Sequence, residues 1–223
     1  MNINLKLIQI DKAINMVEKS PVFEKIYREY LAQVAMIDFK SKTEKLGVQI
    51  NGDEVIIPFF GRPHKVSANG IIDPYGNKPN HSVIVVICKY LLLCPDDYPK
   101  EDDWVSYKNF RDAAPFVGGF VNNVEAPIAR NFACRLDELE QACKGLGGRP
   151  AGIELPYQLS IKFFPLPKVP ILLLFNDEDD EFPAQCSVLF ERRAENYLDM
   201  ECLAIVGMLL SDYLKKVGED LYT

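Results

Sequence analysis

A strand–loop–strand–helix order over residues 164–210 constrains the fold of this chain more than any other feature. Residues 169–175 form a continuous apolar run, which is typical of a strand buried on both faces. Five consecutive acidic residues, 177–181, follow as a loop, and apolar residues at 186, 188 and 190 then mark a returning strand. An Arg-Arg pair leads into an amphipathic helix predicted over about residues 199–216. This order predicts an antiparallel meander with a helix packed against it.

Two antiparallel meanders are predicted, over about residues 46–67 and 157–190. In the first, Asn51-Gly52 supplies the two positive-φ residues of a type I′ hairpin turn, and Gly61-Arg62-Pro63 marks a second reversal. In the second, apolar and polar residues alternate strictly at the start, the pattern of a half-buried strand. Residues 69–80 are rich in turn-forming pairs and are expected to form a loop. The two meanders are compatible with one shared sheet.

The spacing of apolar residues predicts further helices over residues 5–20, 23–34, 117–132 and 135–146. Residues 83–94 allow two interpretations, because their β-branched run suits a strand whereas their length suits a helix. We expect a helix there. Together these elements predict a single α+β domain over residues 1–223, in which antiparallel meanders pack against helices, including a long C-terminal helix.

The composition favours a cytoplasmic protein and argues against nucleic acid or a membrane as a partner. A net charge of −7 repels phosphate backbones. The longest apolar run, Ser82 to Cys94, is interrupted by Lys89 and is shorter than the roughly 20 residues that a membrane span needs. Residues 1–19 lack the apolar core of a signal peptide.

The six cysteines indicate neither a metal centre nor disulfides. None belongs to a C-x-x-C pair, the close spacing that structural zinc and iron–sulfur sites usually need. Most lie among apolar neighbours and are interpreted as small core residues. No metal ligand is predicted, and the sequence identifies neither a cofactor nor an oligomeric state.

The acidic loop and the histidines are the first places to look for catalysis. The five carboxylates of residues 177–181 offer oxygen ligands to a hard cation, but they lack the alternating positions and central glycine of an EF-hand. The other interpretation is a solvated charged loop that discourages edge-to-edge aggregation. His64 and His81 are the only histidines, and neither belongs to a nucleophile motif or a metal-ligand pair. His64 follows a strand reversal and is expected near the surface.

Arginines support a more specific hypothesis. Arg62 lies at a predicted turn, and Arg192-Arg193 close the last predicted strand. A guanidinium binds a carboxylate or phosphate through two parallel hydrogen bonds. If the two meanders are adjacent, Arg62 and one arginine of the pair converge on an anionic ligand. The alternative is that these arginines pair with acidic residues such as Glu181 and Glu191.

Several segments resemble a known family in the same order along the chain. They are Ile57-Pro58-Phe59-Phe60-Gly61-Arg62-Pro63, Trp104-Val105-Ser106-Tyr107, Pro165-Leu166-Pro167-Lys168-Val169-Pro170, Asp180-Glu181-Phe182-Pro183-Ala184, Leu189-Phe190-Glu191-Arg192-Arg193-Ala194 and Tyr197-Leu198. In these residues the chain resembles the domain of unknown function 3786 family, over about residues 31–210. The resemblance implies a source among anaerobic bacteria and archaea, and some relatives carry an iron–sulfur domain of the kind found in corrinoid proteins. This chain lacks the closely spaced cysteines of such a domain.

The resemblance also bears on two candidate residues. The family usually has Tyr or a similar residue at the position of His64, which weakens a catalytic role for this histidine. It usually has Asp at the position of Glu191, so the acidic charge is kept here.

Three functions are compatible with these observations. The first is a non-catalytic binding module for a small anionic ligand, a cofactor or a protein partner, with Arg62, Glu181, Glu191 and Arg192 as ligand-binding residues. The second is a metal-assisted hydrolase or transferase that uses the acidic loop 177–181. The third is a structural partner in a redox or corrinoid complex, which the resemblance suggests through a link to anaerobic corrinoid or one-carbon metabolism. We favour the first, because the motifs lie at strand turns and no nucleophile–base pair is recognisable.

Overall fold

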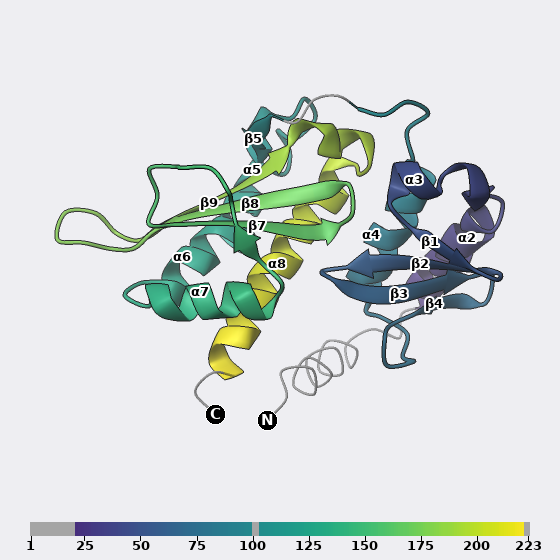
Figure 1. Ribbon diagram of the computed structural model, residues 1–223, viewed down its shortest axis with the longest axis horizontal. Coiled ribbons are helices and arrows are strands. Elements are labelled where there is room, and N and C mark those ends of the chain that lie inside the picture. Colours follow the sequence, from purple (N-terminus) through teal and green to yellow (C-terminus); the bar gives the residue numbers. More distant parts are fainter. Residues whose placement is uncertain (1–20, 100–102, 221–223) are drawn as a thin grey trace.

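The computed structural model describes residues 21–99 and 103–220 and shows an α+β fold (Figure 1). The described chain forms two lobes, each with one antiparallel sheet and its own helices (Figure 1). The predicted fold class is therefore confirmed, but the two meanders belong to separate sheets and do not share one. The helix predicted over residues 5–20 lies outside the described residues.

The first sheet has four strands in the order β1-β2-β3-β4. They are β1 (Gln49–Asn51), β2 (Glu54–Phe59), β3 (Arg62–Ser67) and β4 (Gly70–Ile72). The predicted meander is confirmed, and β4 extends it into the segment that was expected to be only a loop. The first hairpin loop is Gly52-Asp53, one residue later than predicted, and of these two only Gly52 has a positive φ, at 61°. This is the pattern of a type II′ turn, so the predicted type I′ turn is wrong.

The second sheet has five strands in the order β5-β9-β8-β7-β6. They are β5 (Trp104–Ser106), β6 (Arg149–Pro150), β7 (Leu159–Leu166), β8 (Val169–Asn176) and β9 (Gln185–Glu191). The central three strands confirm the meander predicted over residues 157–190, and residues 177–181 form part of the connection between β8 and β9. Short strands β5 and β6 extend the sheet at its two edges.

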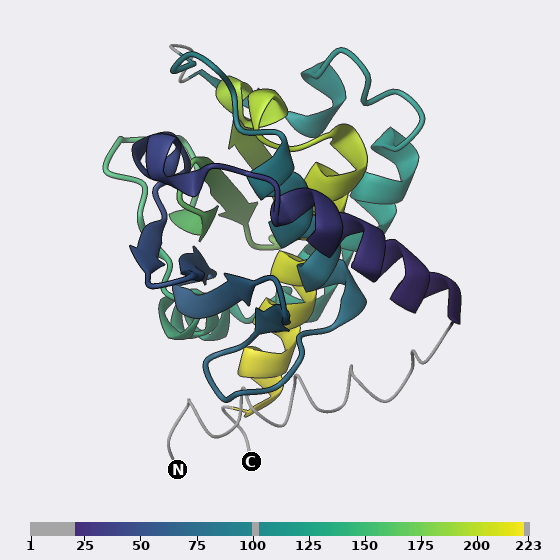
Figure 2. The same cartoon turned by 90° about the vertical axis from the view of Figure 1, so that its right-hand side faces the viewer.

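Helices cover these sheets largely where periodicity predicted them. They are α2 (Pro21–Val34), α3 (Thr43–Leu46), α4 (His81–Leu92), α5 (Val117–Phe120), α6 (Ala126–Phe132), α7 (Leu136–Gly145) and α8 (Met200–Asp220), with short helical turns η1 (Phe39–Ser41), η2 (Tyr107–Asn109), η3 (Val121–Glu125) and η4 (Arg192–Asn196). The ambiguous segment 83–94 is helical, as expected, and Asn80 caps α4 by accepting a hydrogen bond from the Val83 N–H. Helix α2 lies against α4 beside the first sheet (Figure 2). Helix α8 contacts α6 and α7 in its own lobe and α4 in the other lobe.

The two lobes share one continuous apolar core. The buried cluster includes Ile57 and Val66 of the first sheet together with Ile171 and Phe190 of the second. This shared core agrees with the single domain that the sequence predicts, which stays a prediction. No helix in the described part of the chain is long and apolar enough to cross a membrane.

Backbone contacts at the junction hold the lobes in register. The Phe60 N–H donates to the Pro165 carbonyl at 2.9 Å, which links the β2–β3 turn to β7. Gly47 has a φ of 63°, and a Cβ at this position would lie 2.6 Å from a side-chain carbon of Pro167. Glycine tolerates this positive φ and has no Cβ to clash with Pro167, so Gly47 allows α3 to approach the β7–β8 turn.

Candidate functional site

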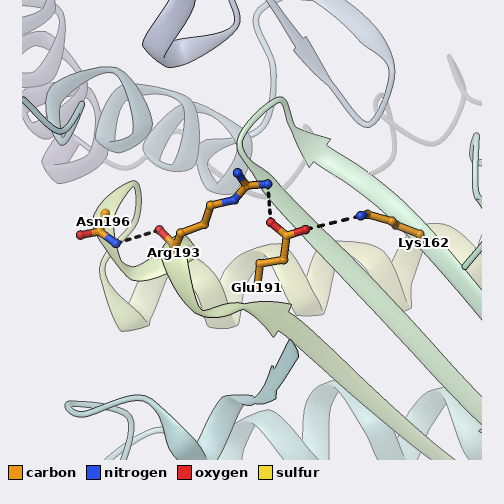
Figure 3. A network of polar contacts seen from close by, with 4 residues as sticks. All are labelled: Lys162, Glu191, Arg193 and Asn196. Atoms are coloured by element: carbon orange, nitrogen blue, oxygen red, sulfur yellow. Dashed lines mark hydrogen bonds and ion pairs between the residues drawn. The ribbon is translucent and has the colours of Figure 1, made fainter. Parts of the chain in front are cut away.

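A buried carboxylate lies on the second sheet near the junction of the lobes. Glu191, the last residue of β9, has a side chain that is only 5% exposed. Its Oε1 lies 3.4 Å from Lys162 Nζ, and its Oε2 contacts Arg193 Nη2 (Figure 3). An ionised carboxylate tolerates such burial only when cations or hydrogen-bond donors surround it. Here two cations share one carboxylate.

Strand alternation places these side chains on the same face of the sheet. Val188 and Phe190 are fully buried in the apolar core, so the next residue, Glu191, points to the opposite face. Trp104 is its register partner on β5 and points the same way. Lys162 occupies the corresponding face of β7, and its Nζ lies 4.9 Å from the centre of the Trp104 ring. The ammonium also lies 5.4 Å from the ring of Phe164, so aromatic faces stabilise its charge on two sides.

Arg193 is fixed by the turn that follows β9. It belongs to η4, and the Asn196 side-chain amide donates to its carbonyl at 3.2 Å (Figure 3). Burial raises the pKa of Tyr197, and the nearby Arg193 charge opposes that rise. Tyr90 stacks on Tyr197 with ring centres 5.6 Å apart and donates its hydroxyl to the Leu46 carbonyl. The arginine therefore lies near two phenols that connect α4 to the second lobe.

A second polar centre surrounds Arg62 at the start of β3. The recess beside it is lined by Phe59, Phe60, Arg62, His64, Asp73, Pro79, Val83 and Tyr213. The guanidinium lies 5.9 Å from the centre of the Tyr213 ring of α8. The recess offers about 10 Å³ to the centre of a water molecule, which is close to the room that one water requires.

A strained turn builds this recess. Phe60 and Gly61 form a two-residue loop with φ values of 46° and 73°. Positive φ is unusual for a bulky residue, but Phe60 is buried and its ring packs edge-on against Tyr213 at 5.3 Å. Burial of the ring offsets the backbone strain and aims Arg62 toward α8.

His64 is buried, which corrects the expectation that it lies near the surface. It is only 6% exposed. It lies opposite the fully buried Ile57 in the β2–β3 pairing, and its side chain is on the same buried face of β3 as Val66. Its Nδ1 lies 3.0 Å from the Arg62 carbonyl, which accepts hydrogen bonds only, so Nδ1 carries the proton. Burial lowers the pKa of this histidine, while the nearby Asp73 carboxylate opposes the shift.

Asp73 gives the recess an acidic side. It is 4% exposed and lies in the loop between β4 and α4. Its Oδ1 accepts hydrogen bonds from the N–H groups of Tyr75 and Asn77 at 2.9 and 2.8 Å. Its buried Oδ2 has no hydrogen-bond partner among the described residues.

The four residues predicted to bind a ligand do not surround one recess. Arg62 lines the recess described above, whose lining includes none of the other three. Glu191 lies in the cluster with Lys162 and Arg193. Arg192 donates its backbone N–H to the Asp103 carbonyl at 2.8 Å. Glu181 is exposed in the acidic loop, where its N–H donates to Asp179 Oδ1. A role in ligand binding for these residues stays a prediction.

The acidic loop uses its carboxylates on its own backbone and on a neighbouring turn. Asp179 Oδ1 accepts from two backbone N–H groups of the loop, which lowers the pKa of this carboxyl. Asp177 Oδ1 accepts from the Cys134 N–H at 2.7 Å. Among residues 21–99 and 103–220, no group of three or more His, Cys, Asp or Glu side chains is arranged to hold a metal ion.

Sequence reasoning missed Lys162, Trp104 and Asp73, and it preferred Arg192 to Arg193. Alternation along residues 157–163 already put Lys162 on the polar face of its strand, but nothing local indicates that Glu191 lies across from it. Asp73 lies in the segment 69–80, which was expected only to form a loop, although aspartate in a turn typically accepts hydrogen bonds from backbone N–H groups. The helical turn after β9 decides which arginine faces Glu191, and no strand periodicity continues through that turn.

Comparison with known proteins agrees with the motifs. Several of the segments that carry the resemblance contact one another: Trp104 pairs with Glu191, and the Phe60 N–H donates to the Pro165 carbonyl. Searches of curated proteins and of solved structures found no significant match. A family model described as "Domain of unknown function (DUF3786)" matches residues 38–213, most of the chain, and the chain therefore belongs to this family.

Proposed function

We propose that this chain is a non-catalytic, cytoplasmic binding module that holds a small anionic ligand, a carboxylate or a phosphate, at Lys162, Arg192 and Arg193. The observation that carries the proposal is the sharing of one buried carboxylate by two partly exposed cations. Glu191 acts here as a positioning residue that fixes both cations.

The charges around Glu191 favour an anion. Lys162 and Arg193 together carry two positive charges against one negative charge, and Arg192 adds a third cation beside them in the sequence. The side chains of Lys162 and Arg193 are 28% and 31% exposed, so both reach solvent, whereas that of Glu191 is buried. In a chain of net charge −7, such a local surplus of positive charge attracts anions selectively.

The donors of these cations also support the proposal. A guanidinium carries five N–H donors, and Arg193 directs Nη2 to Glu191 while its buried Nε has no hydrogen-bond partner among the described residues. Lys162 has three donors and its one contact with Glu191 is long, at 3.4 Å. The buried Nε of Arg193 does not reach solvent, but the exposed parts of the Arg193 guanidinium and the Lys162 ammonium keep donors for a ligand. The rings of Trp104 and Phe164 lie beside the ammonium.

Trp104 provides the test, because it is the only tryptophan in the chain and lies beside Lys162. Titration with phosphate, acetate or citrate at constant ionic strength is expected to change its fluorescence in a saturable way. Lys162→Met is expected to weaken this binding at least tenfold, and Arg192→Ala to weaken it less. Lys65→Met is the matched control, because Lys65 also pairs with one glutamate at 3.4 Å but lies on the first sheet.

The proposal is contradicted if none of these anions changes the Trp104 fluorescence. It is also contradicted if Lys65→Met weakens anion binding as much as Lys162→Met does. The metal-assisted alternative stays a prediction, and metal analysis of the purified protein tests it. The link to corrinoid or one-carbon metabolism likewise stays a prediction from the family resemblance.

A further inference from the structure

The Asp73 carboxylate is satisfied on one oxygen only. Oδ1 accepts two backbone N–H groups at 2.8 and 2.9 Å, which closes the loop that follows β4. Oδ2 is buried and has no hydrogen-bond partner in the described part of the chain. A buried acceptor without a donor destabilises a protein by about 1–3 kcal/mol, so such an atom usually has a small bound partner.

The recess in front of this carboxylate limits the size of that partner. The volume that the centre of a water molecule can occupy in it is about 10 Å³, which is enough for one non-hydrogen atom. The aromatic side chains of Phe59, Phe60 and Tyr213 form its apolar walls. A phosphate or a carboxylate is too large for this volume.

The polarity of the recess limits its chemistry. An anion would lie next to the Asp73 carboxylate, and like charges at such short range repel strongly. His64 is neutral at pH 7, because burial lowers its pKa, and its proton is used on the Arg62 carbonyl. The unpartnered acceptor therefore requires a species that donates hydrogen bonds. The Arg62 guanidinium in the same lining repels a cation as Asp73 repels an anion, which favours a neutral donor such as water over ammonium.

We propose that the recess between Arg62, His64 and Asp73 binds one small hydrogen-bond donor, a water molecule or an ammonium ion, through Asp73 Oδ2. This site is independent of the anion site near Glu191. The sequence suggested an anionic ligand at Arg62. The Asp73 carboxylate in the same recess favours a hydrogen-bond donor instead.

Two measurements on the unaltered protein distinguish the two donors. The first compares the melting temperature in ammonium chloride and in tetramethylammonium chloride at equal concentration, since the larger cation does not fit the recess. A saturable rise in ammonium alone identifies the ammonium ion. The second is a high-resolution crystal structure without ammonium, in which a single ordered atom about 2.7–3.2 Å from Asp73 Oδ2 identifies water. The proposal is overturned if no ordered species lies at Oδ2 and ammonium has no effect, or if a polyatomic anion occupies the recess.

Asp73→Asn tests the polarity directly. The amide oxygen still accepts from the Tyr75 and Asn77 N–H groups, but an NH2 group replaces the unpartnered acceptor Oδ2. An ammonium ion would then meet a donor with a donor, and the melting temperature in ammonium chloride is expected to fall by about 3–6 °C, whereas a water molecule can turn and accept from the new NH2 group. Asp53→Asn, on the exposed first hairpin loop, is the matched control and should change it by less than about 2 °C. An Asp73→Asn protein as stable as the wild type in ammonium chloride would rule out the ammonium ion as the occupant.

Discussion

Glu191 and Asp73 are two buried carboxylates that the protein accommodates in different ways. Glu191 is held by the side chains of Lys162 and Arg193, which come from β7 and from the turn after β9. Asp73 is held by backbone N–H groups of its own loop, two and four residues further along the chain. The first arrangement depends on tertiary structure and leaves a surplus of positive charge. The second is local and leaves one acceptor unused.

This difference determines how each centre responds to a change. Removing a cation from Glu191 leaves a buried charge without adequate compensation, and removing the carboxylate as well repairs the imbalance. Removing Asp73 deletes bonds within one loop, and no second substitution repairs them. Substitutions at each centre test this contrast.

Arg193→Met is expected to have the largest effect. Breaking a buried ion pair typically lowers the free energy of unfolding by 3–5 kcal/mol, and the partial exposure of Arg193 reduces this to about 2–4 kcal/mol. Urea denaturation measures the loss. The double variant Glu191→Leu/Arg193→Met should recover most of it, because the uncompensated carboxylate is gone. The single variant Glu191→Leu completes the comparison. If the stability losses of Glu191→Leu and Arg193→Met simply add in the double variant, the two side chains are not coupled and the contrast fails.

Asp73→Ala is expected to lower the free energy of unfolding by about 2 kcal/mol, because the Tyr75 and Asn77 N–H groups lose their acceptor. The loss should be local. Amide hydrogen exchange at Tyr75 and Asn77 is expected to accelerate, whereas exchange in β9 should stay as slow as in the wild type. Faster exchange throughout both lobes would show that Asp73 supports the tertiary structure as Glu191 does.

The acid sensitivity of the two centres should also differ. Burial lowers the pKa of His64 in the folded protein, so the unfolded chain binds a proton more readily. The stabilising contribution of neutral His64 is therefore fully present above its unfolded pKa of about 6.5 and is lost as the pH falls toward the folded value.

The measurement is urea denaturation of the wild type and of His64→Gln at pH 7.5 and 5.5. Other groups also titrate in this window, and the comparison of the two proteins cancels them. Acidification should destabilise the wild type by about 1 kcal/mol more than the variant. An equal pH dependence of the two proteins would place the proton uptake elsewhere.

Local patterns predicted most of the fold but little of either centre. Alternation and helical spacing identified both meanders, the helix at 81–92 and the long C-terminal helix, because these patterns arise from the period of each element. Strands β4 and β5 are three residues each and too short to show a period. Their existence depends on partners elsewhere in the sheets.

The candidate site was predictable only in part for the same reason. Glu191 and the Arg-Arg pair were recognised, because the pair closes the last predicted strand and Glu191 is an acidic residue with which it could pair. Lys162 lies 29 positions before Glu191, and only the pairing of β7, β8 and β9 brings the two together. The separation of the two meanders into different sheets also removed the expected convergence of Arg62 with Arg192.

Lys162→Met should have the smallest effect on stability and the most informative one. Lys162 is partly exposed and its contact with Glu191 is long, so its loss should lower the free energy of unfolding by only about 0.5 kcal/mol. Lys65→Met, which breaks a comparable pair on the first sheet, provides the reference for a loss of this size. A stability loss as large as that of Arg193→Met would mean that Lys162 is needed to neutralise Glu191 and is not available to a ligand. A small stability loss combined with lost anion binding would show that Lys162 acts mainly on the ligand, whereas Arg193 also holds the Glu191 carboxylate in place.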